Sequence, residues 1–282
     1  MFTKLDELQK KVKKDFIKNY INSKNAASGS LFDPNSNVTS KNIATLEAEL
    51  NKDINIQVNR SLIYSKIEEN FGMEIADSYI KDIEDHLIYV HDETSLKPYC
   101  VSISMYPLLL NGLSGLGGES KAPKHLSSFC GSFVNLLFSV SSQFAGAVAT
   151  VEFLLYFDHF ARIDYGDNYL ETHRNIIDNE LQHVVYAINQ PAAARGYQSV
   201  FWNISLYDIE YFNSMFGEFV FPDMDKPNYQ SLDKLQRFFM KWFNKEREKA
   251  VLTFPVITAA MLTKDKKVYD IDGKECGDYW DG

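Results

Sequence analysis

Cysteine is scarce in this sequence, and no two cysteines lie close together. The 282 residues contain three, Cys100, Cys130 and Cys276. An odd number at wide spacings gives neither the CxxC pairs of zinc ribbons and redox hairpins nor the disulfide framework of a small secreted domain. We therefore expect a chain that works in the reducing cytoplasm and holds no metal ion of its own.

Positive charge is also in short supply, and an apolar leader is missing. The 29 Lys and Arg residues are outnumbered by 38 Asp and Glu residues, which gives a net charge of −9. Such a chain has no overall field that attracts nucleic acid or an anionic membrane. The lysine-rich residues 1–22 lack the apolar core of a signal peptide. We expect neither nucleic acid nor a membrane as a partner.

One uncharged stretch, residues 126–151, is long enough to cross a bilayer. Ser, Asn and Gln side chains are scattered through it, which is unusual for a helix that faces lipid. We expect instead a helix that is buried on most sides within the protein.

The chain is rich in material for a large core, since 45% of its residues are hydrophobic and 14% aromatic. Residues 22–40 are rich in Ser, Asn, Gly and Asp, which predicts that a helix and linker at 1–40 precede one domain at 41–282.

Hydrophobic periodicity predicts helices and strands along most of the chain. The helices are expected at 4–21, 42–50, 61–71, 73–85, 170–188 and 231–249, and the strands at 87–90, 99–104, 199–206 and 251–257. The order strand, long helical insert, strand, helix, strand predicts an α/β fold with a parallel sheet.

Two local patterns leave alternatives open. The glycine-rich residues 111–120 fit either a flexible turn or a phosphate-binding loop, but no GKS or GKT follows, so the Walker pattern is absent. His91 and Asp92 could form an acid–base pair, although such a pair more often orients a loop, and we prefer that interpretation.

Reactive or polar side chains lie in three of the segments. A cysteine in a strand, such as Cys100, is usually a small core residue, but its thiol can also donate a proton or a hydrogen atom. In residues 195–204, neutral polar groups lie on either side of an apolar run, which fits a sugar triphosphate pocket or a buried strand with satisfied polar groups. The third segment, 252–258, is apolar and contains Pro255, which predicts a strand end or an edge there.

In their order and residue types, these segments resemble the anaerobic, glycyl-radical (class III) ribonucleotide reductases over about residues 42–258. The likeness is carried by Tyr89–Asp92 with Cys100, by the run 195–204, and by Phe-Pro-Val-Ile-Thr at 254–258. The family's catalytic domain is a ten-stranded α/β barrel of two parallel five-stranded halves. The resemblance implies that this chain forms about half of that barrel, with a long helical insert and a helical N-terminal region.

The resemblance also implies roles for single residues. Cys100 would lie below the substrate ribose, where loss of the 2′-hydroxyl needs a proton donor and a source of a hydrogen atom. Many relatives have two adjacent cysteines where this chain has Tyr99–Cys100, and Val200 replaces the usual proline before Phe201. The residues implied to contact the substrate are Gln198, Ser199, Asn203, Pro255 and Val256.

The resemblance implies that residues of about 121–165 form the paired helices that meet a second subunit near an effector nucleotide, although the same pattern fits core packing within one subunit. Within this region the resemblance singles out Lys124, His125 and Gln143, and the small residues at 145–147 would let helices approach closely. The implied partners are therefore a ribonucleoside triphosphate substrate, a deoxynucleotide effector and a second copy of the chain.

The family's glycyl radical, which a radical-SAM activase generates, and its four-cysteine zinc site have no counterpart in these residues. The resemblance implies that both lie on a C-terminal reductase fragment, which would be a further partner. We expect Cys276 to be an exposed terminal thiol rather than the family's radical cysteine.

Three hypotheses follow. The first is the N-terminal part of a reductase that converts ribonucleoside triphosphates to deoxyribonucleoside triphosphates and is inactive without its C-terminal partner. The second is a non-catalytic, nucleotide-binding regulatory module of the same family. The third is an unrelated α/β protein with a pocket.

Overall fold

The computed structural model describes residues 6–22, 43–90, 93–114, 119–190, 199–264 and 267–268. The chain forms two compact units, Met1–Pro98 with Pro191–Gln198, and Tyr99–Gln190 with Ser199–Gly282. The helices on either side of the linker predicted to end at residue 40 thus belong to the same unit. Among the described residues, no helix combines the length and the hydropathy of a membrane span.

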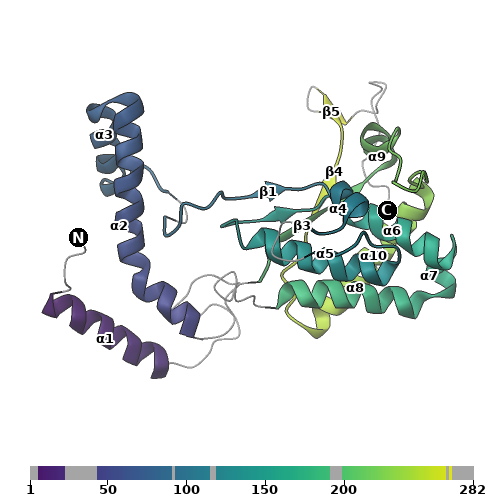
Figure 1. Ribbon diagram of the computed structural model, residues 1–282, viewed down its shortest axis with the longest axis horizontal. Helices are drawn as coiled ribbons and strands as arrows, with labels where there is room; N and C mark the ends of the chain where they lie inside the picture. The colour runs from purple at the N-terminus through teal and green to yellow at the C-terminus, as the bar shows by residue number, and fades with distance from the viewer. Residues whose placement is uncertain are drawn as a thin grey trace. The chain divides into compact units, whose positions relative to one another are not determined.

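The first unit contains three helices, α1 (Glu7–Asn22), α2 (Ile43–Phe71) and α3 (Met73–Glu84). The two helices expected at 42–50 and 61–71 are one continuous helix, because the residues between them include neither Gly nor Pro. Gly72, with φ of +89°, lets α3 turn back and lie beside α2 (Figure 1).

The prediction of a strand at 87–90 was wrong. The main-chain N–H groups of Leu87 and Ile88 both donate to the carbonyl of Asp82, at 2.8 and 3.2 Å. These bonds close the end of α3. Residues 87–90 therefore follow directly from the helix terminus and are not part of a strand.

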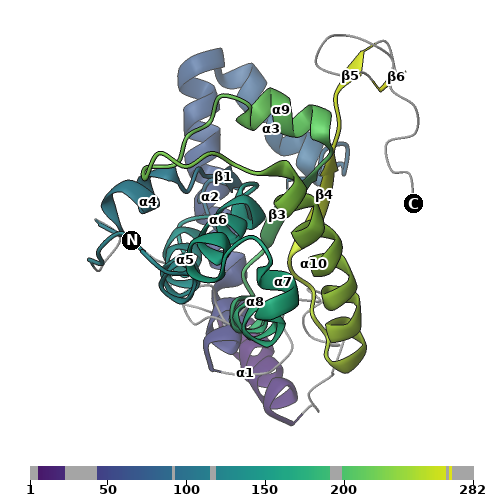
Figure 2. The ribbon, with the colours of Figure 1, turned by 90° about the vertical axis from the view of Figure 1, so that its right-hand side faces the viewer.

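The second unit is built on a parallel sheet of four strands in the order β1-β2-β3-β4 (Figures 1 and 2). The strands are β1 (Val101–Ser102), β2 (Val148–Ala149), β3 (Trp202–Tyr207) and β4 (Val256–Ala260), and a small antiparallel pair, β5 (Thr263–Lys264) and β6 (Lys267–Val268), follows. The α/β class, the parallel sheet and the helical N-terminal region are therefore confirmed.

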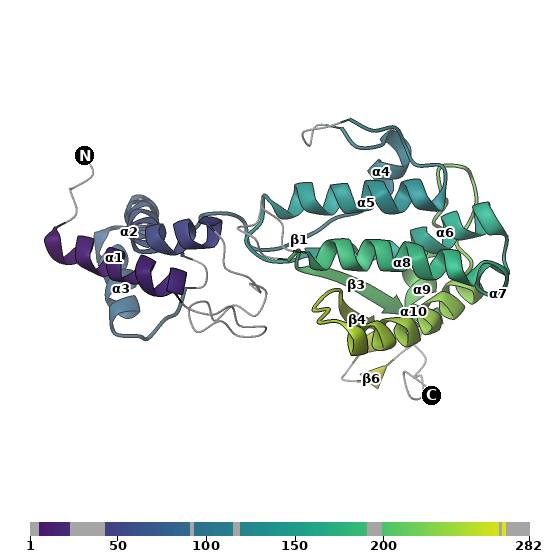
Figure 3. The same cartoon turned by 90° about the horizontal axis from the view of Figure 1, so that it is seen from below.

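Helices connect the successive strands, as parallel pairing requires. They are α4 (Tyr106–Asn111) and α5 (Leu126–Ser141), then α6 (Phe153–Tyr165), α7 (Tyr169–Thr172) and α8 (Arg174–Asn189), then α9 (Ile209–Phe216) and α10 (Tyr229–Lys249). Helices α5, α8 and α10 lie beneath the strands in Figure 1, and Figure 3 shows them from that side.

The long helical insert predicted between the strands at 99–104 and 199–206 contains β2, which the sequence did not reveal. The uncharged stretch 126–151 is helical only to Ser141, and it then turns into a strand. Val148 is held there from both sides: Val101 N–H donates to the Ala147 carbonyl, and Val148 N–H donates to the Phe201 carbonyl. The small residues 145–147 therefore lead into a strand, and the predicted close approach of helices there was wrong.

The core lies between the sheet and the helices beneath it. Trp202 on β3 is fully buried, and its ring contacts Phe133 of α5 and Phe153 of α6, with centroids 5.4 and 4.9 Å apart. Its indole N–H donates to Thr150 Oγ1 at 2.8 Å, which satisfies the polar group of the buried ring. Ile204 and Leu206 point to the same side, since they alternate with Trp202 along the strand.

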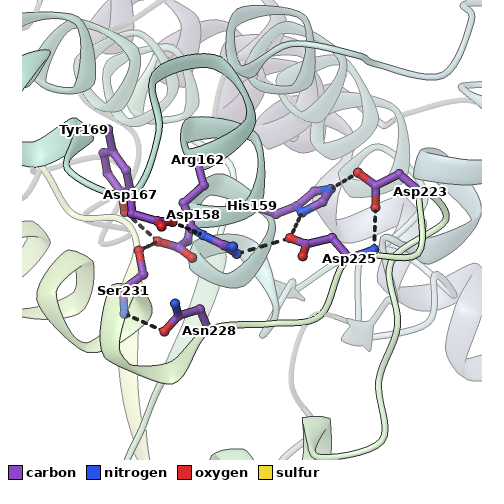
Figure 4. Close-up of polar contacts among 9 residues, drawn as sticks. All are labelled: Asp158, His159, Arg162, Asp167, Tyr169, Asp223, Asp225, Asn228 and Ser231. Atoms are coloured by element: carbon purple, nitrogen blue, oxygen red, sulfur yellow. Dashed lines mark hydrogen bonds and ion pairs between the residues drawn. The ribbon is translucent and has the colours of Figure 1, made fainter.

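A buried polar cluster joins α6, which follows β2, to α10, which leads to β4 (Figure 4). At its centre Asp158 accepts hydrogen bonds from Tyr169 Oη at 2.7 Å and from Ser231 Oγ at 2.5 Å. Burial raises the pKa of the Asp158 carboxyl from 3.8 to about 6.

The same cluster fastens the loop before α10. The buried His159 ring stacks on Phe221 at 3.7 Å, and its two nitrogens lie 3.3 Å from Asp223 and 3.5 Å from Asp225 (Figure 4). Arg162 adds ion pairs to Asp167 at 2.9 Å and to Asp225 at 3.2 Å. These contacts fix the position of α10 against α6, and with it the entry into β4.

Replacement of Asp158 with Asn tests this cluster. The folded protein keeps the Asp158 proton up to about pH 6, whereas the unfolded chain keeps it only up to about 3.8. This group therefore makes the folded state less stable as the pH rises from about 4 to 6, by roughly 3 kcal/mol in total. The amide introduced by Asp158→Asn would retain an oxygen acceptor without ionising, so urea unfolding of the variant should lose that pH dependence.

The matched control is Asp167→Asn, because Asp167 belongs to the same cluster through its ion pair with Arg162 but is exposed. The control should keep the fall in stability between pH 4 and 6. Identical pH profiles for the wild type and Asp158→Asn would contradict the assignment of the buried proton.

Candidate functional site

The helices cover one face of the sheet, and several predicted site residues lie on the other face. In the register, Val101, Val148 and Trp202 pair with one another and point into the core, whereas Ser102, Ala149, Asn203 and Val256 form the next row. Adjacent rows of a sheet point to opposite faces. We call the face that carries the second row the open face.

Cys100 lies one residue before β1, and by alternation from Ser102 we assign its side chain to the open face. Its side chain is exposed, as are those of Ser102, Thr258 and Val256, the last with 49% of its surface accessible. Neighbouring strands are about 4.8 Å apart, so β1 and β3 are separated by about 10 Å and β1 and β4 by about 14 Å. The thiol thus lies on one side of a mixed surface, in which Ser102, Asn203 and Thr258 are the polar residues.

Asn203 is the polar centre of this face. Its Nδ2 lies 3.1 Å from Thr258 Oγ1 on the neighbouring strand, which orients the amide. An oriented amide can both donate to and accept from a ligand hydroxyl. Thr258 and Ser102 were not predicted as site residues, although each is two residues from a predicted one and therefore on the same face of its strand.

Ser199 and Pro255, also predicted to contact substrate, lie in a different environment. Both are buried, and Ser199 Oγ donates to the Asn189 carbonyl at 2.8 Å. Pro255 follows a cis peptide bond from Phe254. Gln198, His91, Asp92 and Cys276 lie outside the described residues.

Asn189, at the end of α8, explains why β4 starts later than the sequence predicted. Its Oδ1 accepts from the N–H groups of Thr253 and Phe254 at 2.9 and 3.0 Å, and its Nδ2 donates to the Phe254 carbonyl at 2.7 Å. The segment expected to begin the strand is therefore held by a side chain, and strand pairing begins at Val256.

The carboxyl ends of β1 and β2 are tied together by Glu152. Its carboxylate accepts from Met105 N–H at 2.9 Å and from the Ser104 hydroxyl at 3.2 Å, and burial raises the pKa of this carboxyl. Tyr207 at the end of β3 donates to the Val151 carbonyl at 2.7 Å. The open face is thus bounded at this end by side chains that are already engaged.

The predicted effector and dimer residues do not form one cluster. Lys124 and His125 precede α5 and Gln143 follows it, and the 16 residues of that helix span about 24 Å. The start of α5 already has an anionic partner, because Asp164 accepts from Leu126 N–H and contacts His125 Nδ1, both at 2.8 Å. All three predicted side chains are exposed.

Potential metal ligands do not converge in the described part of the chain. No group of three or more His, Cys, Asp or Glu side chains within it could hold a metal ion. The described residues therefore contain no set of ligands that matches the family's zinc site.

Comparison with known proteins places these features in a family. The family model described as anaerobic ribonucleoside-triphosphate reductase matches residues 47–278. No curated protein matches the chain.

Solved structures give the same answer. An anaerobic ribonucleotide reductase is 28% identical with a TM-score of 0.76, over 94% of this chain and 41% of that chain. The Thermotoga maritima enzyme, solved with dATP bound in the specificity site and also in complex with dATP and CTP, is 29% identical with a TM-score of 0.72, over 82% of this chain. This chain covers 40% of the Thermotoga protein.

Since the family model matches well over half of the residues, the chain belongs to the anaerobic ribonucleoside-triphosphate reductase family.

Proposed function

We propose that the open face binds a ribonucleoside triphosphate and presents the Cys100 thiol to its ribose. The observation that supports this best is the placement of an exposed thiol on the same face as Asn203 and Val256, which the sequence predicts to contact substrate. The relative crystallised with CTP shows that a ribonucleoside triphosphate can bind a member of this family.

The proposed reaction replaces the 2′-hydroxyl of the ribose with hydrogen. It consumes two electrons and two protons and releases one water. The S–H group of Cys100 can deliver one hydrogen atom to the sugar. An external reductant of the formate or thiol class would supply both electrons of the net reaction, including the one that restores the Cys100 thiol, and the two protons would come from that reductant or from water. The Asn203 amide, oriented by Thr258, would hold a sugar hydroxyl.

Radical initiation needs groups that the described residues do not provide. We propose that a C-terminal reductase segment supplies a thiyl radical derived from an activase-generated glycyl radical, together with the zinc site. That segment would cover the open face, which agrees with the general rule that parallel sheets are covered on both faces. We also propose a cytoplasmic homodimer that binds a deoxynucleotide effector near α5.

A regulatory module is the second candidate. It is favoured by the dATP in the specificity site of the Thermotoga relative and by the exposed positions of Lys124, His125 and Gln143. Such a module would bind deoxynucleotides near α5 and would not need the open face.

Substrate binding can be tested by calorimetry with CTP. Asn203→Ala should weaken CTP binding about three- to tenfold, the range expected for the loss of one hydrogen bond. The control is Asn135→Ala, which removes an exposed amide from α5 and should leave the affinity unchanged. Equal affinities for the wild type and Asn203→Ala would count against the open face as the substrate site.

Turnover provides a second test. The 282-residue polypeptide alone should not reduce CTP, whereas addition of a C-terminal reductase segment with its activase and reductant should give activity that Cys100→Ser abolishes. Deoxynucleotide formation by the polypeptide alone would refute the need for a partner.

Calorimetry with dATP separates the two candidate functions. For a regulatory module, dATP binding should persist in Asn203→Ala and be lost when Gln143 is replaced with a bulky acidic residue. For a substrate-binding domain, the Asn203 variant should weaken the binding of CTP alone, and the Gln143 variant should weaken the binding of dATP alone. If Asn203→Ala lost the binding of both CTP and dATP while the Gln143 variant kept both, a separate regulatory site would be excluded.

A further inference from the structure

The pairing between β1 and β2 departs from a regular parallel ladder at Cys100. In a regular ladder, a residue whose carbonyl accepts a bond from the neighbouring strand also donates its own N–H to that strand, two residues earlier. The Ala147 carbonyl accepts from Val101 N–H at 3.0 Å, so its N–H would be expected to donate to the Tyr99 carbonyl.

The Ala147 N–H bonds to sulfur instead. The Tyr99 carbonyl is taken by the preceding amide, Gly146 N–H, at 2.5 Å, and the Ala147 N–H lies 3.2 Å from Cys100 Sγ. A main-chain donor that ordinarily belongs to the sheet is therefore directed at the thiol.

Gly146 leaves the space that this arrangement needs. A Cβ atom at residue 146 would lie 2.8 Å from Cys100 Sγ and 2.8 Å from the Tyr99 carbonyl oxygen. Both distances are below those that real Cβ atoms show, so any larger residue must displace the sulfur or the strand. Gly146 is buried and its φ is not in the left-handed region, so close approach rather than backbone conformation accounts for the glycine.

We propose that Gly146 and the Ala147 amide are positioning residues for the Cys100 thiol: they form a gap with an N–H donor that fixes the direction of the sulfur on the open face. The importance of this arrangement for catalysis depends on the proposed function, because a hydrogen donor must lie at a defined place relative to the ribose. The gap itself is a property of the β1–β2 pair and can be tested without substrate.

The first test measures the alkylation rate of Cys100 by iodoacetamide, with mass spectrometry to separate it from the buried Cys130 and from Cys276. In Gly146→Ala the sulfur should be moved off the amide toward solvent. The Cys100 rate should rise about three- to tenfold, as expected for the loss of one hydrogen bond. The control, Gly131→Ala on α5, adds a methyl group with nothing within 4 Å and should leave the rate unchanged.

A double variant tests whether the sulfur is the group that Gly146 accommodates. If it is, Cys100→Ala combined with Gly146→Ala should melt at a higher temperature than Gly146→Ala alone, because the smaller side chain makes room for the methyl group. This outcome supports the proposal even if the single variant does not fold. An unchanged alkylation rate, or a double variant as unstable as the single one, would overturn it, since the methyl group would then conflict only with the Tyr99 carbonyl.

Protection by CTP keeps the two proposals apart. Slower Cys100 alkylation of the wild type in the presence of CTP supports the proposed function. If Gly146→Ala changes the alkylation rate of Cys100 but CTP does not slow alkylation of the wild type, the positioning role stands and the substrate assignment is rejected.

Discussion

The structure depends on the covering of a parallel sheet from one side. Parallel sheets are usually buried on both faces, but here α5, α8 and α10 pack on the face that contains Trp202, and within the described part of the chain Ser102, Val256 and Thr258 on the other face are exposed. Strand alternation then places an exposed thiol, an oriented amide and an exposed valine on a common surface. The candidate site is a direct consequence of this asymmetry.

Two groups of polar contacts, one half-buried and one buried, hold the strands in the register that the open face requires. Asn189 joins the end of α8 to the segment before β4, and the Asp158 cluster joins α6 to α10. Both lie in the connections between strands. A substitution in either group of contacts would alter the site by shifting β3 and β4, because those two strands carry Asn203 and Thr258.

Long periodic elements were predictable from the sequence, and short or tertiary ones were not. The strand at Trp202 and the helix ending at Lys249 follow from the spacing of their apolar residues. Strand β2 has two residues and lies in an uncharged run, so only its neighbours on both sides define it. Cys100, Asn203 and Val256 were found through their family resemblance, whereas Thr258 and Gly146 emerged only from strand register and from contacts across the sheet.

The most direct measurement is a crystal structure of this chain with CTP. We predict that the ribose lies over the open face, with a sugar hydroxyl within hydrogen-bond distance of Asn203 and the 2′ position facing Cys100 Sγ. A nucleotide bound only near α5, with the open face empty, would contradict the proposed substrate site.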